Sequence, residues 1–203
     1  VYIEEGHTQV GFMTGSTYLD RIESRLRPGE HLCAFYENKM EQFRMALPFI
    51  ERGLALGEKC LYIADENTVA EIKAGLLMHG VDVERHLSSA QLAILTKRES
   101  YLRLGAFDPE AMISFWDAAI NEALRQGYLG LRATGEASWI LQDLSSTEVF
   151  WEYEAMLNAG FGDRPVKILC QYNTKRFFGD IVVRALRTHP RVLLGLDLYE
   201  NPY

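Results

Sequence analysis

Short apolar runs alternate along the chain with longer stretches in which apolar residues recur every three or four positions. The short runs predict buried strands, and the longer stretches predict amphipathic helices. Parallel strands need crossover helices that cover the sheet, so this alternation predicts an α/β fold: a three-layer sandwich with a mostly parallel central sheet. The predicted strands are 31–36, 60–64, 92–96, 128–133, 166–172 and 191–196.

Start and stop signals mark the predicted helices. The helix after the first strand would end at Gly57 and bury Met40, Phe43, Leu47, Ile50 and Leu54. Capping boxes at 68–71 and 145–148 predict two helix starts, and Asp108-Pro109-Glu110 predicts a third. A last helix is predicted over about 176–187.

Residues 1–27 differ from the rest of the chain because their apolar pattern is weak, apart from a predicted short helix at 17–26. We therefore expect an N-terminal leader or helix over 1–27 and one domain over 28–203. Apolar residues make up 48% of the chain and charged residues 24%, values typical of a globular protein.

Charge and cysteine usage narrow the class of protein. The net charge of −7 argues against a nucleic-acid surface, which normally needs a basic face. Three widely spaced cysteines without a C-x-x-C motif indicate neither a zinc framework nor disulfides, and reduced thiols favour the cytoplasm. The first residues do not resemble a signal peptide, and no apolar run is long enough for a membrane span. We therefore predict a cytoplasmic protein that contacts neither membrane nor nucleic acid.

The ends of the predicted strands are rich in polar and aromatic side chains. Open parallel sheets bind ligands beyond the carboxyl ends of their strands, and such pockets combine aromatic walls with a few polar groups. The alternative is that strand ends are polar because loops lie at the surface. We favour a small-molecule site at this edge, and its predicted ligand-binding residues are Tyr36, Glu66, Tyr101, Arg132, Glu136, Trp139 and Tyr172.

The segment 130–139 is the most informative stretch of this edge. A buried Arg132 needs a carboxylate partner, which Glu136 or Glu154 could supply. One interpretation is an internal ion pair that fixes the loop. The other is a pocket lined by Arg132 and Glu136 with Trp139 as its wall.

The sequence lacks the usual signatures of phosphate binding and covalent catalysis. The segment after the first strand, 36–42, has no glycine and two acidic residues, so it does not resemble a phosphate-binding loop. Neither G-x-G-x-x-G nor G-x-S-x-G occurs. Asp65-Glu66 could coordinate magnesium, or Glu66 could belong to the cap region of the next helix.

His31 and two cysteines could form either a metal or haem site or part of an ordinary packed core. His31 and Cys33 point to the same face of one strand, and Cys170 could join them if the first and fifth strands are neighbours. A hydrogen-bonded core histidine is the preferred interpretation, so no metal or cofactor is predicted. Glu154 and Asn158 share a helix face, interpreted as solvated, and His189 is interpreted as a turn or cap residue.

These residues fall into ordered short motifs that resemble the MEDS domain, a DcmR-type sensory domain named for methanogens and methylotrophs. The resemblance runs from about Pro28 to Leu196. The motifs include Pro28-Gly29-x-His31-Leu32-Cys33, Arg132-Ala133-Thr134-Gly135-Glu136-x-x-Trp139, Tyr153-Glu154-x-x-x-Asn158, Cys170-Gln171-Tyr172-Asn173 and His189-Pro190.

The resemblance implies an input domain of bacterial or archaeal regulators that senses small molecules, such as hydrocarbon derivatives. It also implies a distant likeness to KaiC/RecA-type ATPases, without their phosphate-binding loop. We predict a non-enzymatic, ligand-sensing regulatory domain that acts on an output domain or a partner regulator; a homodimer is compatible with this role. The alternatives are a degenerate KaiC-like nucleotide-binding domain using Asp65, Glu66 and Arg132, and an enzyme built on His31, Glu136 and Tyr172.

Overall fold

A seven-stranded sheet forms the centre of the part of the chain that the computed structural model describes, residues 22–142, 145–177 and 179–201. The strand order is β3-β2-β4-β5-β1-β6-β7, and every pair is parallel except the final β6–β7 pair. The strands are β1 (Glu30–Tyr36), β2 (Lys59–Ala64), β3 (Leu92–Thr96), β4 (Leu131–Glu136), β5 (Val166–Asn173), β6 (Arg191–Leu194) and β7 (Asp197–Glu200).

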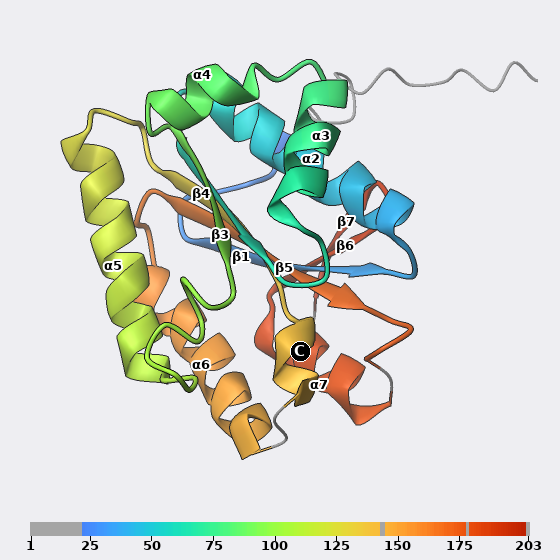
Figure 1. Cartoon of the computed structure of the whole chain (residues 1–203). Helices are drawn as coiled ribbons and strands as arrows, with labels where there is room; N and C mark the ends of the chain where they lie inside the picture. Colours follow the sequence, from blue (N-terminus) through green and yellow to red (C-terminus); the bar gives the residue numbers. More distant parts are fainter. Residues whose placement is uncertain (1–21, 143–144, 178, 202–203) are drawn as a thin grey trace, which may run out of the picture.

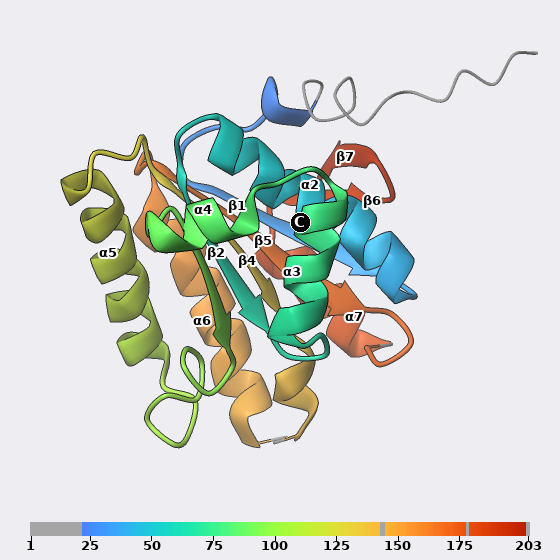
Figure 2. The same cartoon turned by 45° about the horizontal axis from the view of Figure 1, so that its top comes forward.

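Helices cover both faces of this sheet, with a separate hydrophobic core under each layer (Figure 1). One layer holds α2 (Lys39–Ala55), α3 (Val69–Met78) and α4 (Val83–Ser88). The other holds α5 (Pro109–Arg125), the short 3-10 helix η1 (Ser138–Gln142), α6 (Ser145–Phe161) and α7 (Asp180–Thr188). In the rotated view α3 and α4 lie in front of the sheet and α6 lies behind it, and the predicted three-layer α/β sandwich is confirmed (Figure 2).

The helix starts follow from the local sequence. Thr68 and Glu71 form the predicted capping box of α3, in which each side chain bonds the other residue's backbone. Asp108 caps α5, and Pro109 occupies its first turn, as predicted. The side chains of the predicted capping box at 145–148 are only partly described, so that prediction lies outside the described residues.

The strand β4 begins three residues later than predicted. The sequence indicated 128–133, but Tyr128 still bonds back to the end of α5, and the backbone of Leu129 bonds to Gly57. The strand therefore contains Thr134, Gly135 and Glu136 instead of ending before them. This shift decides where the side chains of the 130–139 segment lie.

Smaller differences between the predicted and the observed elements have local causes. Gly195, in the left-handed region at φ 57°, allows a hairpin that adds β7, and a cap at Asp82 starts the extra helix α4. Met40 is exposed because the helix turns Met45 and Phe49 to the core instead.

The leader predicted over 1–27 lies mostly outside the described residues. Its described end belongs to the core, since Ile22 is buried under the α2 layer. None of the described helices is long and apolar enough to cross a membrane.

Candidate functional site

The carboxyl ends of β1, β2, β4 and β5 meet at one edge of the sheet, which we call the rim. Its hub is the buried carboxylate of Glu136. One oxygen, Oε2, accepts hydrogen bonds from the backbone amides of residues 65, 66 and 67, at 2.5–3.0 Å. The other, Oε1, accepts from Tyr62 Oη and from Asn67 Nδ2. Glu136 thus fixes the loop between β2 and α3.

Glu66, in that loop, bridges the ends of three strands. Ser138 Oγ, just after β4, and Arg176 Nη1, after β5, contact its Oε1, the latter at 3.5 Å. Asn173 Nδ2, at the end of β5, donates to its Oε2 at 2.9 Å, and the amide of Lys175 holds Asn173 in that orientation. Ser138, Asn173 and Arg176 can each donate a hydrogen bond, so together they form a set of donors for an anion or another acceptor.

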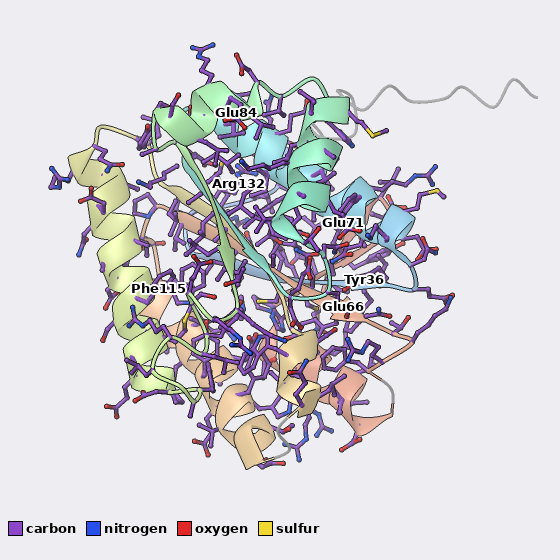
Figure 3. All side chains as sticks on the ribbon, in the orientation of Figure 1. Tyr36, Glu66, Glu71, Glu84, Phe115 and Arg132 are labelled. Carbon is purple, nitrogen blue, oxygen red and sulfur yellow. The ribbon has the colours of Figure 1, made fainter. Side chains whose placement is uncertain are left out.

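The inner side chains of the rim are buried. Tyr36 and Glu136 are buried, and Figure 3 shows Tyr36 close to Glu66. The hydroxyl of Tyr36 makes no hydrogen bond to the described residues, and its burial, with Glu66 and Glu136 adding to the effect, raises its pKa. A surface hollow of about 270 Å³ lies elsewhere, between the ends of α2, α3 and α4.

The structure places Arg132 at the opposite end of β4 from the rim (Figure 3). The expectation that Glu136 or Glu154 pairs with it was wrong. Its Nε donates to Glu58 at 2.5 Å, and its Nη2 donates to Glu23 at 2.8 and 3.0 Å. The late start of β4 explains the difference, because Arg132 is the second residue of the strand, away from its carboxyl end.

Three of the four predicted aromatic residues, Tyr101, Trp139 and Tyr172, lie on the other face of the sheet from Tyr36 and Glu136. Tyr101 stacks on Trp139 at 4.9 Å between ring centroids, and both belong to the core under α5 and α6. Tyr172 is fully buried in the same core. Strand residues alternate between faces, so the structure does not bring the seven predicted residues into one pocket.

The start of α2 is capped by the chain's own side chains. Asn38 accepts from the amide of Glu41, and Glu41 in turn accepts from the amide of Glu37. One amide of the first turn, that of Glu41, and one amide before the helix, that of Glu37, are therefore bonded to the chain's own side chains, one of them acidic. This arrangement gives the nucleotide-binding alternative no support.

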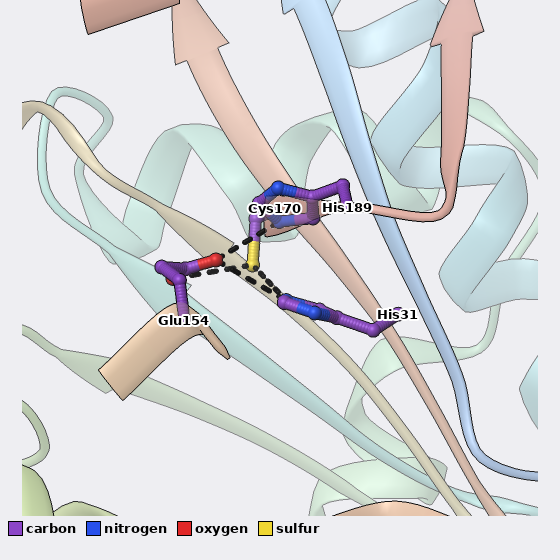
Figure 4. A group of neighbouring side chains, drawn as sticks. All are labelled: His31, Glu154, Cys170 and His189. Carbon is purple, nitrogen blue, oxygen red and sulfur yellow. Dashed lines mark hydrogen bonds and ion pairs between the residues drawn. The ribbon is translucent and has the colours of Figure 1, made fainter. Parts of the chain in front are cut away.

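A second group of polar side chains is buried on the α6–α7 face, where β1 and β5 are neighbours. We call His31, Glu154, Cys170 and His189 the His–Glu–Cys cluster (Figure 4). The ligating atoms of these four residues all lie within 4.8 Å of one another. His31 and Cys170 were weighed as ligands from the sequence, but Cys33, weighed with them, lies outside the cluster and has its Sγ 3.8 Å from the carbonyl of Arg191.

Of the other two members, Glu154 was misjudged, whereas His189 is the C-cap residue of α7, as predicted. Glu154 was interpreted as part of a solvated face, but it is 1% exposed. His189 does follow the last turn of α7, yet its ring is buried and turned inward, 2.9 Å from Glu154. Two features of the sequence could have indicated the cluster: the four-residue spacing of Glu154 and Asn158, and the position of His189 just before a buried strand. Neither could be used without knowing which strands are adjacent.

Burial and mutual charge set the protonation of the cluster. Burial alone would raise the pKa of Glu154, but the two imidazoles, His189 more than His31, outweigh it and lower this pKa to about 2. Burial, reinforced by His31, lowers the pKa of His189, and Glu154 offsets only part of this effect. Burial raises the pKa of Cys170, to which Glu154 and Cys33 add.

The chain is 27% identical over 175 residues to the transcriptional repressor DcmR of Methylorubrum extorquens, an alignment that covers 85% of this chain and 60% of that protein. The chain thus spans about 60% of the length of this relative. Residues 30–190 match the family described as the MEthanogen/methylotroph, DcmR Sensory domain. The chain therefore belongs to the MEDS family of sensory domains.

Proposed function

We propose that this chain is the effector-sensing input of a signal-transduction or transcription regulator. It acts by binding and not by turnover, and it passes the signal to an output domain or a partner regulator. Membership of a sensory-domain family and similarity to a transcriptional repressor support this role. A ligand switches such a domain only if it binds two states with different affinity.

The effector binds at the rim in this proposal, and the observation that carries it is the environment of Glu66. Ser138, Asn173 and Arg176 surround its carboxylate with donors. Glu66 itself is 21% exposed at its side chain, so solvent reaches this group while Glu136 remains buried. An effector that carries a carboxylate or another acceptor oxygen replaces Glu66 among these donors. The displaced Glu66 then releases the link between the β2–α3 loop and the segments after β4 and β5.

A substitution at Glu66 tests this proposal. Glu66→Gln keeps the size of the side chain but removes the charge that competes with the effector. A hydrogen bond to a charged group contributes about 1.5–3 kcal/mol, so we expect short carboxylates to bind the variant roughly tenfold more tightly than the wild type. Titration calorimetry and thermal shifts with acetate and butyrate measure this difference, and ethanol and butanol serve as uncharged counterparts.

Glu122→Gln is the matched control, because Glu122 is a partly exposed glutamate on α5 that also pairs with an arginine, Arg125. The control should bind as the wild type does. Equal carboxylate affinity in the wild type and in the Glu66 variant would contradict the proposal. Stabilisation by ATP with magnesium alone would restore the nucleotide-binding alternative.

A further inference from the structure

The His–Glu–Cys cluster is separate from the rim, and it gathers acceptor atoms from four different elements. His31 lies on β1, Glu154 on α6, Cys170 on β5, and His189 between α7 and β6. All four are buried in the core. Such groups are rarely buried together without a proton or a cation between them.

The partners of the two imidazoles fix where their protons are. His189 Nδ1 lies 2.7 Å from the carbonyl of Ala185, which can only accept, so Nδ1 carries the proton. His31 Nδ1 lies 2.9 Å from Asn158 Oδ1, and Asn158 Nδ2 donates to the carbonyl of Thr188, which fixes the orientation of the amide. In the neutral rings, both Nε2 atoms therefore present lone pairs to the cluster. This anchoring of Nδ1 is typical of histidines that bind metals.

With both rings neutral, lone pairs face lone pairs around Glu154 Oε2, while the Cys170 thiol donates to the other oxygen, Oε1, at 3.9 Å. Glu154 Oε2 lies 3.2 Å from His31 Nε2 and 2.9 Å from His189 Nε2. Among the described residues, neither Glu154 Oε2 nor His189 Nε2 makes a hydrogen bond of acceptable geometry, although both are buried. A central cation would satisfy all of these atoms at once.

We propose that His31, Glu154, Cys170 and His189 bind one divalent d-block cation of the zinc type. In a tetrahedral zinc site, ligand bonds of about 2.0–2.3 Å place two nitrogen or oxygen ligands about 3.3 Å apart, and a nitrogen and a sulfur about 3.6 Å apart. The observed separations include 3.2 Å from His31 Nε2 to Glu154 Oε2 and 3.4 Å from His31 Nε2 to Cys170 Sγ. The other separations include 2.9 Å between His189 Nε2 and Glu154 Oε2, and none exceeds 4.8 Å, so small shifts of these side chains would place the four atoms on a tetrahedron.

Charge and donor type favour this class of cation. The carboxylate of Glu154 and the thiolate of Cys170 together neutralise a divalent ion, so the filled site has no net charge to bury. Binding displaces the proton of the Cys170 thiol to solvent. Imidazole and thiolate donors suit zinc and cobalt, whereas magnesium and calcium require mostly oxygen ligands. The cation would tie α6 and the α7–β6 junction to the sheet, which adds a metal requirement to the sensory domain.

Cobalt gives the test a spectroscopic signature. The chain is purified without a metal-affinity step, stripped with a chelator, and titrated with Co²⁺ and then with Zn²⁺. We expect one equivalent of Co²⁺ to produce the intense visible bands of a tetrahedral site and a near-ultraviolet thiolate-to-cobalt band, which Zn²⁺ then abolishes. Failure to bind one equivalent of either ion, or the weak bands of an octahedral site, would overturn the proposal.

Two cysteines in register provide a matched pair of variants. Cys33 and Cys170 are both buried and lie opposite each other on β1 and β5. Cys170→Ser should abolish the thiolate band, whereas Cys33→Ser should retain it. The reverse result would refute the assignment of ligands. Circular dichroism in chelator establishes that each variant is folded.

A variant on the surface avoids disturbing the core. Asn158 is exposed and holds His31 through Nδ1. Loss of such a partner typically weakens metal binding about 10–100-fold, so Asn158→Ala should bind Zn²⁺ more weakly by that factor. Asn121→Ala, on the exposed face of α5, is the control and should bind normally. Equal zinc affinity in the two variants contradicts the proposed geometry. The outcome is independent of the rim proposal, because neither variant touches Glu66 or its partners.

Discussion

Replacement of Arg132 by Met tests whether the ion pairs at the amino end of β4 stabilise the fold. The guanidinium is 1% exposed and bonds to Glu58 and Glu23, and it lies over the ring of Phe49 at 4.8 Å. Methionine keeps much of the apolar stem over that ring. The variant therefore removes the charge and the hydrogen bonds and creates only a small cavity.

The size of the destabilisation depends on Glu58 and Glu23, the two carboxylates that lose their partner in the Arg132→Met variant. Removal of one partner of a buried ion pair costs about 3–5 kcal/mol, because the other charge stays buried without compensation. Lys167 Nζ remains 2.6 Å from Glu58 and 3.2 Å from Glu23, so we expect the lower end of that range, about 3 kcal/mol. For a domain of this size, that loss lowers the melting temperature by about 6–12 °C.

Equilibrium unfolding in urea, monitored by circular dichroism, measures the loss. The double variant Arg132→Met/Glu58→Gln removes one uncompensated charge and should recover about 1 kcal/mol or more. Arg125→Met breaks the exposed Arg125–Glu122 pair and should leave the free energy of unfolding almost unchanged. A loss below about 1 kcal/mol for Arg132→Met, or no recovery in the double variant, would refute this reasoning.

The ion pairs of Arg132 also predict how the free energy of unfolding depends on pH and on the size of residue 53. Burial tends to raise the pKa of Glu58, but Arg132 and Lys167 outweigh it and hold this pKa below its usual value of 4.5. A depressed pKa in the folded state stabilises the protein above the unfolded pKa, and this stabilisation disappears as the pH falls through the folded pKa. Urea unfolding at pH 7 and at pH 3 measures this effect. The free energy of unfolding of the wild type should exceed that of Glu58→Gln by a large margin at pH 7 and by a smaller margin at pH 3. The same margin at both pH values would contradict the role given to Glu58. Gly53→Ala should also destabilise the fold, because the added methyl group would lie 2.6 Å from Arg132 Cδ, and unchanged urea unfolding would show that Arg132 can shift freely.

The sequence predicted the layers of this fold because its elements carry strong local signals. The apolar runs at β2, β3 and β5 and the caps at Thr68 and Asp108 each favour one local structure. The start of β4 was predicted wrongly, because the apolar segment 128–133 resembles a strand, whereas the hydrogen bonds that delay the strand come from α5 and from Gly57. Tertiary contacts of this kind do not appear in a local pattern.

In the candidate sites, too, the sequence predicted what local patterns determine and missed what depends on tertiary contacts. Glu66 and Glu136 were predicted at the carboxyl edge, and the structure places both there. Arg132 was misplaced by the late start of β4, and the faces of Tyr101 and Trp139 were not predicted. The His–Glu–Cys cluster depends on the adjacency of β1 and β5 and on the return of α7 toward β1. Sequence distance hides both features, since His31 and Cys170 are 139 residues apart.

Hydrogen–deuterium exchange of the chain with and without saturating butyrate is the most direct measurement of sensing at the rim. Our account predicts altered exchange in residues 65–67 and 173–176, where Glu66 and its partners lie, and no change in residues 112–125 of α5. The Glu66→Gln variant should reach the altered pattern at lower butyrate concentration. Unchanged exchange at the rim, or a change confined to other segments, would contradict it.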